Sequence, residues 1–146
     1  METLRFVVYI DAPKDEVWSV MLDPNTYQEW TASFAEGSYY EGSWDEGETI
    51  RFLTPQRRGM LAVIAEKKPY EYISIKHVGI VKDGIEDTES PEVKAWAPAY
   101  ENYTFVEENG VTELRVDVEV TPEEKNHAGR LWPRALARLK LICEES

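Results

Sequence analysis

The sequence predicts one α+β domain in which a curved antiparallel sheet surrounds a long C-terminal helix. Three observations support this fold class: a period of two at the N-terminus, a long strand-rich middle with regular turn signals, and an apolar helical stripe at the C-terminus. Helical and strand-like segments do not alternate, so a parallel α/β fold is not expected. The length of 146 residues fits a single domain over residues 1–146 with one core.

The first strand is predicted over residues 3–10. Its apolar side chains alternate with mostly polar ones, and one face collects Leu4, Phe6, Val8 and Ile10. Successive side chains of a strand point to opposite faces, so we expect these four to face the core.

Two short helices are expected directly after this strand. Pro13 suits a first helical turn, and the acidic residues Asp15 and Glu16 suit the positive end of a helix, which predicts a helix from Pro13 to about Leu22. The pair Asp23-Pro24 repeats the signal and predicts a second short helix that ends near Trp30.

The middle of the chain reads as an antiparallel meander from about residue 38 to residue 105. Counting the first strand, and a last one with Leu114, Val116, Val118 and Val120 facing inward, the sheet is predicted to have six or seven strands. Residues 82–98 are acidic, contain two prolines and show no sustained period, which predicts a long loop.

The last segment carries the strongest helix signal. Thr121, Pro122 and Glu124 form an N-cap, a first-turn proline and a capping-box acid, so a helix is predicted to begin at Thr121. Its apolar stripe is Ala128, Leu131, Trp132, Ala135, Leu136, Leu139, Ile142 and Cys143, while Arg130, Arg134 and Arg138 form a solvated row. Pro133 removes the hydrogen bond to the carbonyl of Gly129, where we expect a kink.

Composition and charge narrow the partner classes. Sixteen basic and 28 acidic residues give a net charge of −12, which disfavours nucleic acid and anionic membranes as partners. A single cysteine allows no internal disulfide, and no secretory signal or membrane-length apolar run is found, so we expect a cytoplasmic protein. Two histidines and one cysteine are too few for a zinc cage, and no nucleotide or cofactor motif occurs, so neither a metal nor a cofactor is expected.

Several stretches together resemble a known superfamily. They are IDAPKDEVWSVMLDPNTYQEW, GSWDEGETIRF, KPYEYISIKHVG, ENYTF and LWPRALARLK, which cover nearly the whole chain. They are similar to the START-like, or SRPBCC, superfamily, and within it to homologues of the heat-shock-protein ATPase activator. The resemblance implies a helix-grip fold, in which a bent sheet and a long C-terminal helix enclose a space that many members use for small hydrophobic ligands. Other members are enzymes or chaperone partners, so the fold alone does not assign an activity.

Three polar residues are candidates for the cavity wall. His77 shares the parity of Ile73 and Ile75, which would place an imidazole among apolar side chains as a ligand anchor or proton donor. Glu101 and Tyr103 share one parity on the next strand, and a carboxylate near the imidazole would fix its tautomer. A rim histidine bonded to backbone or water and a solvated Glu101 remain open alternatives.

Aromatic and aliphatic residues supply the remaining candidates. The resemblance implies that Trp30 and Trp132 border the cavity and its entrance, and Leu136 lies on the same stripe as Trp132. The same helix residues could instead fill the space. Trp96 in the acidic loop is expected to fold back onto the body as a lid, and Cys143 is expected to be inert packing.

The leading functional hypothesis is binding of a small hydrophobic molecule in a cavity between the sheet and the C-terminal helix. The alternatives are an enzyme of the cyclase, dehydratase or hydrolase kind, with His77, Tyr103 or Glu101 as general acid or base, and a chaperone-associated protein partner. No catalytic residue, ligand identity or oligomeric state is assigned by the sequence.

Overall fold

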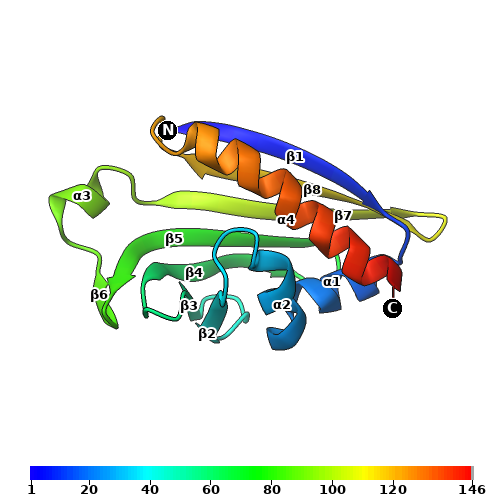
Figure 1. Ribbon diagram of the computed structural model, residues 1–146, viewed down its shortest axis with the longest axis horizontal. Coiled ribbons are helices and arrows are strands. Elements are labelled where there is room, and N and C mark those ends of the chain that lie inside the picture. The colour runs from blue at the N-terminus through cyan, green and yellow to red at the C-terminus, as the bar shows by residue number, and fades with distance from the viewer. Residues whose placement is uncertain (146) are drawn as a thin grey trace.

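The computed structural model describes residues 1–145 and contains a single antiparallel sheet with a long helix packed against its concave face (Figure 1). The elements follow the chain as β1 (Glu2–Ile10), α1 (Lys14–Leu22), α2 (Pro24–Thr31), β2 (Tyr39–Gly42), β3 (Thr49–Leu53), β4 (Gly59–Lys68), β5 (Tyr72–Lys82), β6 (Ile85–Asp87), α3 (Pro91–Lys94), β7 (Ala99–Glu108), β8 (Val111–Val120) and α4 (Lys125–Glu145).

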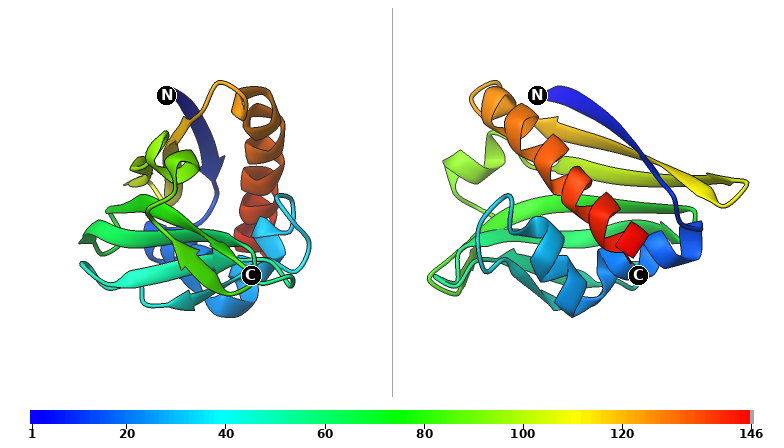
Figure 2. Two further views of the ribbon diagram at one scale, coloured as in Figure 1. Left: turned by 90° about the vertical axis from the view of Figure 1, so that its left-hand side faces the viewer. Right: turned by 45° about the vertical axis from the view of Figure 1, so that its right-hand side comes forward.

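The sheet has the spatial order β1-β8-β7-β5-β4-β3-β2, and the short β6 pairs with β5 beside this path. Figure 2 shows the sheet curving around α4, while α1 and α2 lie near the C-terminal end of that helix. The β4–β5 pairing has two register shifts, between Leu61 and Ala62 and between Ile64 and Glu66, and such bulges bend a strand. The predicted α+β helix-grip class is therefore confirmed.

The alternating strands face the core as predicted. Residues of β1 alternate between shielded and exposed, with Arg5 and Val7 among those on the outside. On β8 the predicted inward set Leu114, Val116, Val118 and Val120 is buried. One continuous cluster joins these residues to the buried faces of α1, α2 and α4.

The two short helices form where the cap signals predict them. Asp23 accepts hydrogen bonds from the backbone amides of Asn25 at 2.9 Å and Thr26 at 3.4 Å, which satisfies the first free donors of α2. Pro13 stands at the N-cap position of α1 instead of inside its first turn. Because Asp23 alone connects α1 to α2, Tyr27 and Trp30 of α2 are directed toward the sheet, where both are buried.

The C-terminal helix differs from its prediction at the start. The capping box forms, since the Glu124 amide donates to Thr121 Oγ1 at 3.3 Å and the Thr121 amide donates to Glu124 Oε1 at 3.2 Å. Residues 122–124 form a turn, however, and α4 begins at Lys125. The box thus organises the entry to the helix without being part of it.

From Lys125 the helix continues without a break through Pro133 to Glu145. Gly129 and Pro133 are both exposed, so the carbonyl that loses its partner lies on the solvent side. The arginine row at 130, 134 and 138 is exposed as predicted, whereas Trp132, Ala135, Leu136, Leu139 and Cys143 are buried. No helix within residues 1–145 is long and apolar enough to cross a membrane.

The prediction of one long loop over residues 82–98 is wrong. β5 extends to Lys82 and turns back through Asp83 and Gly84 into β6, which gives the sheet an eighth strand within residues 1–145. Asp83 and Gly84 both have positive φ, the conformation that two-residue hairpins require and that an Asp-Gly pair favours. Ser90 then caps the single turn of α3 through a hydrogen bond from the Val93 amide.

Candidate ligand-binding cavity

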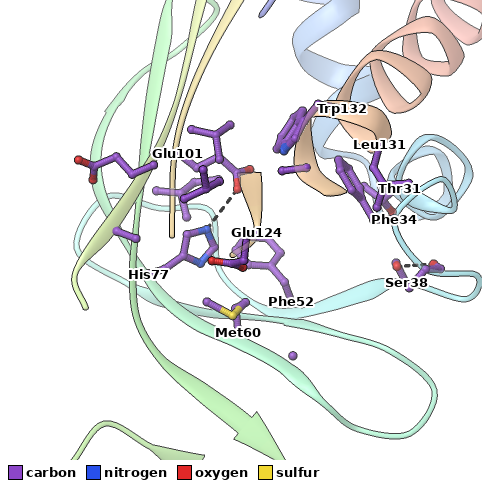
Figure 3. A pocket seen from close by; sticks show the side chains of 18 of the residues that line it. Thr31, Phe34, Ser38, Phe52, Met60, His77, Glu101, Glu124, Leu131 and Trp132 are labelled. Carbon is purple, nitrogen blue, oxygen red and sulfur yellow. Dashed lines mark hydrogen bonds and ion pairs between the residues drawn. The ribbon is translucent and has the colours of Figure 1, made fainter. Parts of the chain in front are cut away.

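A cavity of about 820 Å³ lies between the concave face of the sheet and the N-terminal half of α4 (Figure 3). Its walls come from α2 and the segment after it, the middle of the sheet, the end of α3 and the residues that lead into α4. This volume is in the range of pockets that enclose small organic molecules. Aromatic side chains form much of its wall, among them Trp30, Phe34, Phe52, Trp96, Tyr103 and Trp132.

The polar part of the wall is a hydrogen-bonded group of three side chains on β5 and β7. In the β5–β7 register Ile75 pairs with Glu101 and Ile73 pairs with Tyr103, so His77, Glu101 and Tyr103 project from the same face. His77 Nε2 lies 3.2 Å from Glu101 Oε1, and the Tyr103 hydroxyl donates to Glu101 Oε2. Figure 3 shows the imidazole joined to the carboxylate at the cavity wall.

Burial strengthens this group. The side chains of His77 and Glu101 are 13% and 19% exposed, and Tyr103 is fully within the core. Burial and the neighbouring Glu101 carboxylate raise the pKa of Tyr103 well above its ordinary value, because both oppose a phenolate. The phenol therefore stays protonated and remains a donor to Glu101.

His77 has one ring nitrogen without a partner. Nε2 faces Glu101, while Nδ1 is buried and makes no hydrogen bond. In the tautomer that donates from Nε2 to Glu101, Nδ1 carries no proton and is an acceptor without a partner. The Phe52 ring lies 5.8 Å from the imidazole and covers part of it.

The aromatic wall is built as a contiguous set. Trp132 packs edge-on against Phe34 at 4.8 Å between centroids and stacks on Phe6 at 6.0 Å. The indole N–H of Trp30 donates to the Met21 carbonyl at 3.1 Å, which fixes the ring and leaves its apolar surface for the wall. Because each ring is braced by neighbours, the space between them stays open.

Five of the six predicted site residues line this cavity: Trp30, His77, Glu101, Tyr103 and Trp132. Leu136 does not. It is one turn beyond Trp132 and is buried in the core, so the helix stripe borders the cavity at its N-terminal half and packs solidly after that. Glu101 is mostly shielded, which contradicts the alternative of a solvated Glu101.

The sequence signals for the other wall residues differ in strength. Phe34 lies in the aperiodic segment between α2 and β2, where no strand or helix parity assigns a direction. Phe52 shares the parity of buried Ile50 on β3, and this parity was a usable signal. Trp96 follows α3, lines the cavity and is partly buried, in the position expected of an aromatic residue folded back onto the body.

The charge around the cavity is mostly negative. Besides Glu101, four further glutamates contribute atoms to the lining, namely Glu92, Glu119, Glu123 and Glu124, although the Glu119 carboxylate accepts from the Tyr100 amide. The basic side chains among the lining residues are Arg58 and the two histidines. Within residues 1–145 no group of three or more His, Cys, Asp or Glu side chains could bind a metal ion.

Comparison with known proteins identifies a family. The family described as "Activator of Hsp90 ATPase homolog 1-like protein" matches residues 11–144 of this chain. No curated protein matches the sequence.

Solved structures with the same fold extend over almost all of the chain. MLL2253 from Mesorhizobium loti is 14% identical with a TM-score of 0.73, and the match covers 99% of this chain and 98% of that one. The Aha1 dimer from Colwellia psychrerythraea is 17% identical with a TM-score of 0.72, covering 99% and 97%. DynU16 from the dynemicin biosynthetic locus is 18% identical with a TM-score of 0.73, but 99% of this chain spans only 48% of that protein.

Proposed function

This chain belongs to the Activator of Hsp90 ATPase homolog 1-like family, and we propose that it binds a small hydrophobic molecule in the cavity between the sheet and α4. The observation that carries the proposal is the open cavity of about 820 Å³ with braced aromatic walls. Unfilled apolar space lowers the stability of a protein, so a cavity of this size is a cost that ligand binding would offset.

The side chains along α4 also favour ligand binding over a fully packed core. Leu136, Leu139 and Cys143 fill the space beneath the C-terminal half of the helix. Beneath the N-terminal half the small Ala128 lines the cavity, and Trp132 lies against Phe34 and Phe6 at the wall. The sequence therefore leaves room at one end of the helix and removes it at the other.

The test uses an environment-sensitive apolar dye, N-phenyl-1-naphthylamine, and two matched helix variants. We expect the native protein to bind the dye with enhanced fluorescence and a raised melting temperature. Ala128→Phe puts a ring into the cavity and is expected to weaken binding by about tenfold or more, because dye and ring compete for one volume. Ala137→Phe changes an exposed position of the same helix and should bind like the native protein. Absence of dye binding, or equal binding by both variants, would contradict the proposal.

The second candidate is an enzyme acting on such a ligand. The observation that favours it is the carboxylate of Glu101 placed between an imidazole and a phenol inside the cavity, a set that suits general acid–base chemistry. Once a ligand that turns over is found, His77→Ala should reduce kcat strongly while KM changes little. Unchanged turnover in that variant would rule out His77 as the acid or base.

A further inference from the structure

Glu101 is a shielded carboxylate of the cavity wall that keeps unused hydrogen-bonding capacity. A carboxylate offers about four acceptor positions. His77 Nε2 and the Tyr103 hydroxyl each use one, on different oxygens. The side chain is 19% exposed and lines the cavity, so the remaining positions are available to a bound molecule.

The two protein donors fix this acceptor in place. Tyr103 comes from the same strand two residues away, and His77 comes from the neighbouring strand, so the carboxylate is held from two directions. Since both protein partners reach the carboxylate from the wall, its remaining acceptor positions face the cavity.

The rim of the cavity is also mostly acidic. Glu92, Glu123 and Glu124 line it together with Arg58 and His127. The protein as a whole carries a net charge of −12. An anionic headgroup would therefore meet like charge at the rim and at the wall, and would have to lose its hydration to do so.

We propose that Glu101 is the acceptor for the polar group of the bound molecule, so that the ligand is an apolar ring system with a hydroxyl or ammonium donor and no negative charge. This inference rests on the proposed binding function. It excludes fatty acids and other carboxylates as ligands, because they have an apolar body but an anionic polar group. His77 and Tyr103 are positioning residues, which orient the acceptor without themselves receiving the ligand's proton.

The test compares four naphthalene derivatives with one ring system and different polar groups, measured by calorimetry on the full chain. They are 2-naphthol, 2-(aminomethyl)naphthalene, 2-methoxynaphthalene and 2-naphthoate. The hydroxyl or the ammonium derivative is expected to bind about tenfold tighter than the methyl ether, since the ether has no proton to donate to a charged acceptor. The naphthoate is expected to bind weakest. The relative affinities of 2-naphthol and 2-(aminomethyl)naphthalene show whether the cavity prefers a hydroxyl or an ammonium donor.

Two isosteric variants locate the effect. Glu101→Gln removes the charge at the wall and should narrow the preference for naphthol over naphthoate by about tenfold. Glu108→Gln removes an exposed charge outside the cavity lining and should keep the native ranking. The ranking by the native protein remains a test even if Glu101→Gln does not fold.

The outcomes distinguish the two proposals. Equal binding of all four compounds, or a native preference for naphthoate, would overturn the assignment of Glu101 and leave the binding function standing. The same conclusion follows if Glu101→Gln retains the native ranking. Failure of all four compounds to bind would overturn the binding function and the assignment with it.

Discussion

At the scale of single residues, Glu101 shows how a charged side chain is tolerated inside an apolar wall. A carboxylate removed from water needs donors to replace its hydration, and His77 and Tyr103 supply one for each oxygen. The stability of the site and its chemical character thus come from the same three side chains.

Cys143 gives a prediction about alkaline pH. Burial first, and then the negative charge of nearby glutamates, raises the pKa of this thiol from 9.0 to about 12. Between these values the unfolded chain loses the thiol proton while the folded chain keeps it. The free energy of unfolding should therefore be unaffected by this group below about pH 9 and should fall as the pH rises toward 12.

The measurement is urea unfolding across this pH range for the native protein and for Cys143→Ala. The variant is expected to be less stable at neutral pH, because it leaves a small cavity, and to lose less stability between pH 9 and pH 12. Parallel curves for both proteins would show that the thiol does not contribute to the alkaline loss.

Residue parity explains which site residues were predictable. His77, Glu101 and Tyr103 lie on β5 and β7, whose pairing has no register shift, so period-two reasoning placed all three on the inner face correctly. Phe34 lies in a segment without regular structure, and Leu136 lies on the right stripe but past the end of the cavity. Sequence periodicity assigns a face to a residue, whereas the extent of an empty space depends on three-dimensional packing.

At the scale of elements, α4 is expected to contribute to stability through one side only. Leu139 is completely buried, and Leu141 of the same helix is 44% exposed. Leu139→Ala should lower the free energy of unfolding by about 2–5 kcal/mol, whereas Leu141→Ala should change it by about 0.5 kcal/mol or less. The two variants have equal helix propensity, so urea unfolding of both isolates the effect of burial. A similar loss in both would contradict the packing described for α4.

The element boundaries show where local signals are incomplete. Asp83-Gly84 predicts a hairpin turn, but the strands it joins include the three-residue β6, which is too short to show a period. At the entry of α4 the capping box was identified correctly at Thr121 and Glu124, yet the helix begins only at Lys125. A cap identifies the neighbourhood of a helix end more firmly than its first residue.

At the scale of the whole molecule, the net charge of −12 predicts a dependence on salt. Like charges repel most in the compact state, and salt screens them. The melting temperature should therefore rise when sodium chloride is increased from low to roughly physiological concentration. A variant with exposed Glu36, Glu41 and Glu48 changed to Gln should melt higher at low salt and gain less from added salt. An equal salt response in both proteins would argue against self-repulsion as the cause.

The neighbouring position of β1 and β8 has a consequence for the order of folding. Glu2 pairs with Val120, so β1 acquires β8, its partner among the strands of residues 1–145, after the other strands have been synthesised. Contacts so distant along the chain slow folding, because a large loop must close before they form. On the ribosome, Leu4, Phe6 and Val8 would wait without a partner strand until β8 emerges. The edge that completes the sheet is thus also the segment with the longest exposure to mispairing during synthesis.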